Sequence, residues 1–351
     1  MNFTEEKLNL LPSLLLPWYR ISKRDLPWRN TTDPYAVWIS EIMLQQTRVD
    51  TVIERYTVFL DRFPTVDSLA RCEMDDLLKT WEGLGYYSRA RNLKKAAEII
   101  SDTFGGQFPD DYETIRDLPG IGEYTAGAIS SIAFNFPVPA VDGNVLRVLS
   151  RFLPSYEDIS LPATKRYFTD LLRPVYPDDC SAFTQALMEL GALVCLPNGK
   201  PLCGKCPLKE RCGAAAGSSW GELPVNKKKK TNKEQELSVF LLKHDGRVAL
   251  RKRQMSGLLK GMWEFPNIEG HWDDETINHV ITDLGVQPLK VLLRGDFIHV
   301  FTHITWHMRV YDVICSKTVP DLVWATEKEL TEIYALPTAF RKVLKKEQPE
   351  H

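Results

Sequence analysis

The chain has 351 residues, 44% of them hydrophobic and 26% charged, with 44 Lys and Arg against 46 Asp and Glu. This length exceeds one ordinary core, so two or three domains are expected, and the composition is typical of a globular protein. The sequence has no apolar run of the roughly 18 residues that a membrane helix needs, which excludes a membrane protein of that kind. A net charge of −2 excludes a uniformly basic polymer, but residues 200–233 hold nine Lys or Arg against two acids, a local patch suited to phosphate.

The first 216 residues or so are predicted to be helical. Asp33 can cap a helix that begins at Pro34, and the apolar residues that follow recur at helical spacing. Residues 75–81, 89–100 and 124–133 show the same periodicity. This part of the chain is therefore expected to be mainly α.

Glu41 lies in the first of these helices, three residues after Trp38 and four before Gln45, at the edge of the apolar stripe. An isolated helix glutamate is more often half solvated. A glutamate beside a buried tryptophan can instead have a raised pKa and carry a proton. This segment alone leaves both alternatives open.

Two glycines, Gly120 and Gly122, stand in the segment LPGIGEYTAGAI just before a predicted helix. Glycines let the backbone turn tightly, and exposed N–H groups at a helix N-terminus can hold a phosphate oxygen. The alternative is an ordinary glycine-rich turn between packed helices. The complete segment has a helix-hairpin-helix pattern, which favours a grip on the DNA backbone that reads no sequence.

Asp142, in VDGNVLRVLSR, stands where an apolar segment changes to a predicted helix. On its position alone, a structural helix N-cap is the expected role. The helix start is also expected to keep this carboxylate ionised, because the dipole and the unpaired N–H groups favour an anion. An ionised carboxylate is what a cationic sugar intermediate needs beside it.

Four of the seven cysteines are clustered as C-x7-C-x2-C-x5-C, at Cys195, Cys203, Cys206 and Cys212. An odd total with one tight cluster argues against a disulfide scaffold and favours a metal site in a reducing compartment. Four thiolates at this spacing fit either zinc or an iron–sulfur cluster, and the spacing alone does not choose between them.

Residues 217–236 lack apolar periodicity and contain Gly, Ser and a lysine run, so they are predicted to be a linker. Residues 237–242 and 247–250 are predicted strands. In residues 304–311 the apolar side chains alternate with polar ones, which predicts a strand with one buried face. A second, α+β domain over 237–351 follows from this change of pattern.

Taken together, these segments resemble the adenine glycosylase (MutY) branch of the helix-hairpin-helix DNA glycosylases. The resemblance runs from about Leu26 to the end of the chain, through ISEIMLQQTRVDTV, WEGLGYYSRARNL, LPGIGEYTAGAI, VDGNVLRVLSR and the cysteine cluster. It implies a mainly α helix-hairpin-helix glycosylase domain over residues 1–216, with an iron–sulfur module at about 195–212. It further implies a monofunctional enzyme that flips adenine out of a mispair and hydrolyses its bond to deoxyribose.

The resemblance implies catalytic roles for four residues. Glu41 would protonate adenine at N7, and Asp142 would stabilise the oxocarbenium-like sugar or attack it to form a transient adduct. Asn144 would orient the carboxylates. Tyr124 stands where lyase-active relatives carry a lysine, so no Schiff base is expected, and its hydroxyl could support the charged intermediate.

Other positions would contact the DNA. The residues that would line the adenine pocket are Trp28, Arg29, Leu44 and Gln185. Those that would occupy the gap in the duplex are Gln46, Thr47, Leu84 and Tyr86, with Tyr86 wedged beside the opposite base.

The resemblance assigns one 4Fe–4S cluster to the four clustered cysteines, and a monovalent cation is expected at the helix-hairpin-helix. The chain departs from the usual pattern because seven residues, not six, separate Cys195 from Cys203. Gly199 in that loop could accommodate the extra residue.

The second domain resembles the Nudix-like recognition domain of the same enzymes, through GLLKGMWEFP at 257–266 and FIHVFTHITWHM at 297–308. A pyrophosphatase would need a dense Arg/Glu helix for magnesium, and residues 278–285 keep only Asp283 and Gly285 of it, so hydrolysis is expected to be lost. Phe301, Thr302 and His303 match the family's Phe-Ser-His loop that reads 8-oxoguanine, with Thr in place of Ser. Without the family, a strand end packed on the core would be the expected role of this tripeptide.

The predicted activity is therefore hydrolysis of adenine from A·8-oxoguanine and A·G pairs in duplex DNA. The rivals are a bifunctional glycosylase/lyase, a non-catalytic lesion-binding protein and a nucleotide pyrophosphohydrolase. A monomer without a membrane partner is expected, in the cytoplasm, with the nucleoid if the source is bacterial.

Overall fold

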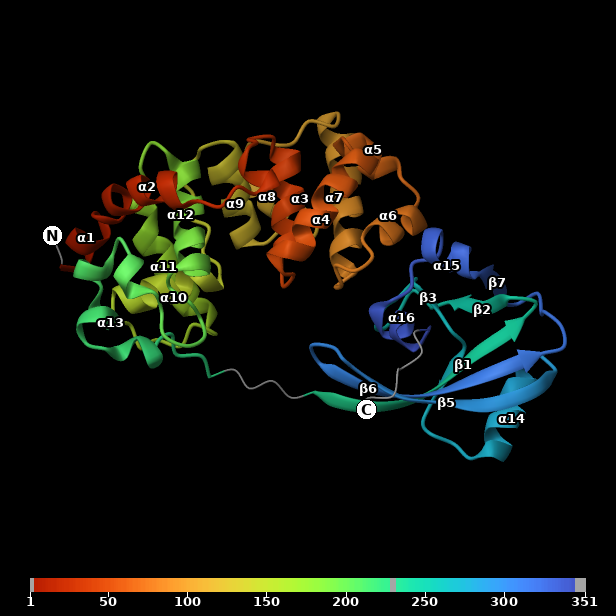
Figure 1. Cartoon of the computed structure of the whole chain (residues 1–351). Helices are drawn as coiled ribbons and strands as arrows, with labels where there is room; N and C mark the ends of the chain where they lie inside the picture. The colour runs from red at the N-terminus through yellow and green to blue at the C-terminus, as the bar shows by residue number, and fades with distance from the viewer. Residues whose placement is uncertain (1–2, 228–231, 345–351) are drawn as a thin grey trace. The chain divides into compact units, whose positions relative to one another are not determined.

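The computed structural model describes residues 3–227 and 232–344, and the chain divides into two compact units (Figure 1). Unit 1 comprises Met1–Arg71 and Arg91–Lys228, and unit 2 comprises Cys72–Ala90 and Lys229–His351. Unit 2 therefore includes a stretch of the helical half of the sequence that no sequence pattern had separated from its neighbours. No helix within 3–227 or 232–344 is both long and apolar enough to cross a membrane.

Unit 1 is helical, as the periodicity predicted. Its helices are α1 (Phe3–Leu8), α2 (Leu11–Ser22), η1 (Pro27–Arg29), α3 (Pro34–Leu44), α4 (Val49–Arg62), α5 (Val66–Arg71), most of α7 (Ser88–Phe104), α8 (Tyr112–Asp117), α9 (Glu123–Ala133), α10 (Gly143–Phe152), α11 (Pro162–Leu172), η2 (Arg173–Val175), α12 (Cys180–Leu193), η3 (Cys203–Lys205), η4 (Lys209–Arg211), α13 (Gly213–Ala216) and η5 (Ser219–Gly221). The predicted cap is present, since the Asp33 side chain accepts a hydrogen bond from the Tyr35 N–H at 3.1 Å.

A core of large apolar side chains packs the N-terminal helices of unit 1 against its later helices α10, α11 and α12. Leu11 and Leu15 from α2, Leu149 from α10, Phe168 from α11 and Phe183 from α12 are all fully buried in it. Helix α3 is more deeply enclosed than its predicted one-sided stripe, because every residue from Tyr35 to Met43 is buried. A polar side chain on this helix is therefore held inside the protein.

The segment predicted to be a linker is partly structured. It contains η5, a buried Leu223, and Val225, whose carbonyl accepts a 3.0 Å hydrogen bond from the Ile159 N–H. Strand β1 (Lys233–His244) begins inside the same segment. The lysines at 228–230 lie outside the described residues.

Unit 2 is built on a mixed sheet with the order β3-β2-β1-β6-β5, with β4 paired to β1 and β7 to β2. Its remaining elements are α6 (Met74–Thr80), β2 (Arg247–Lys252), β3 (Trp263–Glu264), β4 (Asn267–Glu269), α14 (Asp274–Asp283), β5 (Pro288–Val300), β6 (Ile304–Cys315), β7 (Val323–Thr326), α15 (Glu327–Glu332) and α16 (Thr338–Leu344). β1 and β6 run parallel, and β5 and β6 antiparallel.

The sheet is covered on both faces. One core contains Trp306, Met308 and Val310 with Phe340 of α16, and the other contains Tyr311 and Val313 with residues of α14 (Figure 1). The prediction of one buried face for β6 was therefore incomplete: burial alternates from Trp306 to Val310, and beyond Val310 the other face is buried as well, against α14.

Candidate active site

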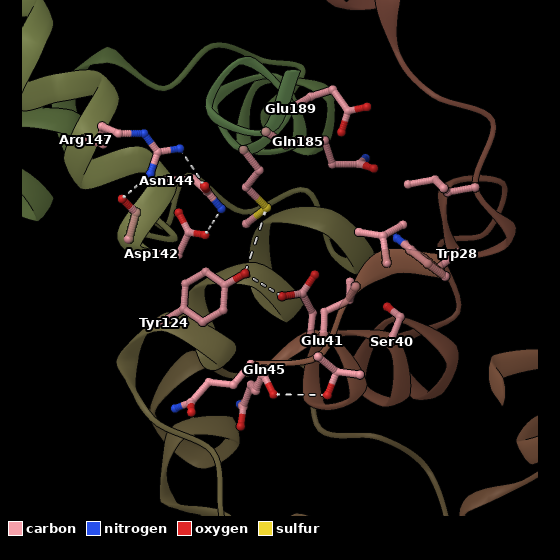
Figure 2. A pocket seen from close by; sticks show the side chains of 18 of the residues that line it. Trp28, Ser40, Glu41, Gln45, Tyr124, Asp142, Asn144, Arg147, Gln185 and Glu189 are labelled. Carbon is pink, nitrogen blue, oxygen red and sulfur yellow. Dashed lines mark hydrogen bonds between the residues drawn. The ribbon is translucent and has the colours of Figure 1, made fainter. Parts of the chain in front are cut away.

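A cleft of about 890 Å³ opens in unit 1 and is lined by several separate segments of the chain. Every position predicted for catalysis and for the adenine pocket lies on its wall: Trp28, Arg29, Glu41, Leu44, Tyr124, Asp142, Asn144 and Gln185. The packing of η1, α3, α9, α10 and α12 thus brings together residues that are up to 157 positions apart in the sequence. Figure 2 shows how the side chains of Trp28, Glu41, Tyr124, Asp142, Asn144 and Gln185 lie around the cleft.

Glu41 is buried, with 6% of its surface exposed, so the half-solvated alternative is wrong for this residue. The Tyr124 hydroxyl donates a 2.7 Å hydrogen bond to its Oε2. Burial raises the pKa of Glu41 to about 7, against the opposing effects of the Tyr124 hydrogen bond and the Arg29 charge, while the Asp142 charge adds to the increase. A substantial fraction of Glu41 is therefore protonated at neutral pH, which suits a proton donor.

Tyr124 stays neutral in this setting. Burial, together with the charges of Glu41 and Asp142, raises the pKa of its hydroxyl well above the ordinary value. The hydroxyl also lies 4.0 Å from the Sδ of Met188 on α12. Tyr124 can donate a hydrogen bond here, and it offers no amine.

Asp142 is the N-cap of α10, as predicted: its Oδ1 accepts a 2.7 Å hydrogen bond from the Val145 N–H. Its Oδ2 accepts a second one, also 2.7 Å, from Asn144 Nδ2. Burial nevertheless raises the pKa of Asp142 above its ordinary value, although both hydrogen bonds lower it. The hydrogen bonds at the helix start lower the pKa, in the direction expected from the sequence, but burial, which local sequence does not reveal, has the larger effect.

Asn144 is held from its other side. Arg147 Nη2 donates a 2.8 Å hydrogen bond to Asn144 Oδ1, and the same Nη2 lies 2.8 Å from the Gly191 carbonyl. Among the described contacts, Asn144 orients Asp142 and forms no hydrogen bond with Glu41.

One buried acid of the cleft, Glu189 on α12, was not predicted from the sequence. Its side chain is fully buried and binds both Arg24 and Arg29. Figure 2 shows Glu189 on the same helix as Gln185. Arg29 also donates to Gln185 Oε1, at 2.9 Å. Glu189 follows Gln185 by four residues, so the two share a helix face, and this spacing is the signal that could have found it.

The predicted hairpin is formed by α8 and α9. Gly120, at its tip, has a φ of +80°, and a Cβ there would lie 2.6 Å from the Cβ of Asn92, so the position favours glycine on two grounds. Gly122 is the N-cap of α9, and no described side chain caps that end. The first N–H groups of α9 are therefore available to an anion.

The residues predicted to fill the duplex gap are divided between the units. Gln46, with a φ of +58°, and Thr47 lie on the wall of the cleft in unit 1. Leu84 and Tyr86 belong to unit 2, where Leu84 is buried and 44% of the Tyr86 surface is exposed. Within unit 2 the Tyr86 hydroxyl forms a hydrogen bond with Thr302 Oγ1.

Phe301, Thr302 and His303 form a tight turn between β5 and β6, closed by a 2.8 Å hydrogen bond from the Phe301 N–H to the Ile304 carbonyl. Phe301 packs edge-on against Trp306, with ring centroids 4.9 Å apart, so the structural alternative holds for this residue. Thr302 is half-buried and His303 is exposed, and neither belongs to the core.

The four clustered cysteines line one small cavity in unit 1, with Arg151 and Pro201 among the other lining residues. Burial raises the pKa of the Cys206 thiol to about 12, and the charges of the other three cysteines add to the increase. Gly199, in the longer loop, has a φ of +70°, a conformation suited to a tight reversal. Among the described residues, no three His, Cys, Asp or Glu side chains converge closely enough to hold a single metal ion.

Comparison with known proteins identifies both halves of the chain. Residues 39–174 match the HhH-GPD superfamily of base excision DNA repair proteins, and residues 238–346 match the NUDIX domain. A solved structure of a thermostable thymine-DNA glycosylase superposes with a TM-score of 0.56 at 29% identity, over 62% of this chain and all of its own. A trapped endonuclease III–DNA covalent intermediate, at 22% identity and a TM-score of 0.53, shares the fold.

The adenine DNA glycosylase of Rattus norvegicus is 34% identical over 94% of this chain and 76% of its own length. That of Buchnera aphidicola subsp. Schizaphis graminum is 35% identical over 84% of this chain and 85% of its own. These relatives confirm the family and the combination of helical and Nudix-like domains expected from the motifs. The chain thus belongs to the adenine DNA glycosylase family and is a DNA N-glycosylase of base excision repair.

Proposed function

We propose that this enzyme hydrolyses the N-glycosidic bond of adenine paired with 8-oxoguanine or guanine in duplex DNA, with Glu41 as general acid and Asp142 as the group that stabilises the sugar cation. The observation that carries the proposal is the pairing of two different carboxyl environments in one cleft. Glu41 accepts one hydrogen bond and is otherwise enclosed, whereas Asp142 accepts two. Hydrogen bonds to a carboxylate favour its ionised form, so Glu41 is the proton carrier of the pair.

The proposed reaction begins with transfer of the Glu41 proton to N7 of the flipped adenine. The bond between N9 and C1′ then breaks, and its electron pair leaves with the neutralised base. The positive charge that develops on the sugar is stabilised by the Asp142 carboxylate, or trapped by it as an ester. Glu41, now ionised, accepts a proton from the water that adds to C1′, which restores the enzyme.

The cleft supports a monofunctional reaction. Tyr124 stands at the lyase lysine position, and no lysine is among the described residues that line the cleft. A Schiff base with the sugar requires an amine. The β-elimination that would break the strand is therefore not expected of this enzyme.

The proposed reader of the opposite base is the turn at 301–303. Thr302 offers a hydroxyl and the exposed His303 an imidazole, both suited to hydrogen bonds with an altered guanine edge. The pyrophosphatase rival is disfavoured because α14, which corresponds to the magnesium helix, turns Ile277 and Ile281 to the core and lacks the dense Arg/Glu pattern.

We assign a 4Fe–4S cluster to the four cysteines. All four line one small cavity. Cysteine thiolates are the ordinary ligands of a 4Fe–4S cluster, for which Cys195, Cys203, Cys206 and Cys212 would be the four ligands. The preference for iron over zinc comes from the family resemblance. When bound, such a group would supply cross-linking of this module and electron-transfer chemistry.

Three further expectations remain proposals: a monovalent cation at the α8–α9 hairpin, a monomeric state, and a cytoplasmic location. Duplex DNA containing the mispair is the proposed partner.

The test uses duplex DNA with one A·8-oxoguanine pair, and a matched duplex with C·8-oxoguanine as control. The proposal predicts free adenine from the first duplex only, and strands that break only after alkali. Strand breakage before alkali would support the lyase rival. Tight binding without release of adenine would support the lesion-binding rival.

A further inference from the structure

Glu189 is the one acid of the cleft for which the proposed reaction gives no role. It lies on α12 with none of its side chain exposed. Its Oε1 accepts hydrogen bonds from the Arg24 backbone N–H, at 3.0 Å, and from Arg24 Nε, at 2.7 Å. Its Oε2 accepts from Arg24 Nη2, at 2.9 Å, and from Arg29 Nη2, at 2.7 Å.

A fully buried carboxylate costs several kcal/mol unless ion pairs and hydrogen bonds replace its water. Glu189 has both the ion pairs and the hydrogen bonds that this requires. Burial raises its pKa, but the two arginines lower it by more, so the pKa lies below its ordinary value. Glu189 is therefore ionised at neutral pH, and its four hydrogen bonds anchor both guanidinium groups.

Arg29 interacts with two buried acids whose pKa values are shifted in opposite directions, upward for Glu41 and downward for Glu189. It is bound to Glu189 and Gln185, and its Nη1 also donates to the Tyr19 hydroxyl at 3.0 Å. Its charge reaches Glu41, whose pKa it lowers, yet no hydrogen bond or ion pair joins the two among the described contacts. Its buried Nε has no hydrogen-bond acceptor among the described residues, so this N–H of the guanidinium could still bind an anion.

We infer that Glu189 is a positioning residue that anchors Arg29 and so prevents Arg29 from forming an ion pair with Glu41, which keeps the proton on Glu41. This inference rests on the proposed role of Glu41 as general acid. It explains why Glu41 can stay protonated in the same cleft as Arg29: the arginine already forms an ion pair with the ionised Glu189.

The protonation of Glu41 depends on all the charged and titratable groups that line the cleft with it. They are Arg24 in the segment between α2 and η1, Arg29 on η1, Tyr124 on α9, Asp142 and Arg147 at α10, and Glu189 on α12. Three cations and two other acids are present, since Tyr124 is neutral. Removal of Glu189 leaves three cations against Asp142 alone and releases Arg29, and both changes favour the ionised form of Glu41.

The experiment measures the pH dependence of single-turnover adenine release by the full-length enzyme. The wild type should be fastest below pH 7 and lose about tenfold per pH unit above it, where Glu41 ionises. In Glu189→Gln the alkaline limb of the pH–rate profile, where the rate falls as Glu41 ionises, should move to lower pH by about 1–3 units, the usual effect of an opposite charge close to a carboxylate. Rates at the acidic end should approach the wild-type value.

The matched control is Glu264→Gln. Glu264 is also a buried glutamate that pairs with two arginines, Arg251 and Arg253, but it lies in unit 2. Its substitution should lower the melting temperature without moving the limb. A Glu189→Gln enzyme that is less stable but has the wild-type limb would overturn the inference, because a purely structural role predicts that result.

A double-variant comparison adds a second test that a purely structural role of Glu189 would fail. In an Arg29→Gln background no guanidinium is left at position 29 to be released, so the added Glu189→Gln change should move the limb much less than it does in the wild type. An equal movement in both backgrounds contradicts the inference. A failure of the proposed function would give another result. If Glu41 were not the general acid, Glu41→Gln would keep the wild-type rate and pH–rate profile, independently of any substitution at Glu189.

Discussion

The Tyr124 hydroxyl on α9 donates a 2.7 Å hydrogen bond to the Glu41 carboxylate on α3, across 83 residues of sequence. This bond works against burial, because it favours the ionised form of Glu41. The cleft thereby holds Glu41 at a pKa of about 7, between the value of a free carboxyl and that of a fully unpaired buried one.

Tyr124→Phe should therefore move the alkaline limb of the pH–rate profile upward. A hydrogen bond to a charged group is worth about 1.5–3 kcal/mol, which corresponds to an increase of roughly one to two pH units in the pKa of Glu41. Tyr56→Phe is the matched control, since the Tyr56 hydroxyl donates to the Ala36 carbonyl of the same α3 helix and does not contact Glu41. Single-turnover rates between pH 5 and 9 measure the effect. An unshifted limb in Tyr124→Phe would mean that the hydrogen bond does not tune the acid.

Asp142→Asn separates the two roles of that residue. Asparagine caps a helix about as well as aspartate, so stability should change by less than about 1 kcal/mol. Adenine release should nevertheless fall by several orders of magnitude, because an amide neither neutralises a sugar cation nor forms an ester with it. Asp111→Asn, at the N-cap of α8, is the control that should leave the rate unchanged. If Asp142→Asn kept substantial activity, Asp142 would be a cap and nothing more.

The caps and the large periodic elements were predictable because they depend on neighbours in the sequence. Asp33 and Asp142 cap the helices that follow them, as expected from residues one to three positions away. The positions on the cleft wall could be named only through the family resemblance, since nothing local distinguishes Glu41 from other helix glutamates.

The features of the fold and the site that were not predicted depend on contacts that only the folded chain creates. The Tyr124–Glu41 bond, the burial of Glu189 and the upward pKa of Asp142 all result from helices that meet across long separations. The same holds for residues 72–90, which the contacts assign to unit 2. There Glu82 accepts 2.5 Å hydrogen bonds from Arg341 Nε and Nη2. No periodicity in either segment carries that information.

Cys206→Ser tests the cluster assignment. Anaerobically purified wild-type protein should be brown, with about four iron atoms per chain, and Cys206→Ser should lose iron and stability. Cys72→Ser, outside the cluster, should keep the wild-type iron content. Stoichiometric zinc in a colourless, active wild type would contradict the assignment.

Thr302→Ala tests the proposed lesion reader more cleanly than removal of the second domain. A deletion would also take away the hydrogen-bond partners of Glu82 within unit 2. Loss of one hydrogen bond to the base should reduce the preference for 8-oxoguanine over guanine by about 1–3 kcal/mol, and Thr302→Ser should retain it. The measurement is the ratio of single-turnover rates on A·8-oxoguanine and A·G duplexes at one salt concentration. An unchanged ratio would place recognition elsewhere.

The most direct test of the account is the single-turnover rate of adenine release from an A·8-oxoguanine duplex by Glu41→Gln, measured beside the affinity for the same duplex. Glutamine keeps the size of the side chain and removes the transferable proton. The account predicts a loss of at least about 10²–10⁴-fold in rate, with binding within a few-fold of the wild type. A rate near that of the wild type, with intact binding, would contradict it, because the protonation of adenine would then not depend on Glu41.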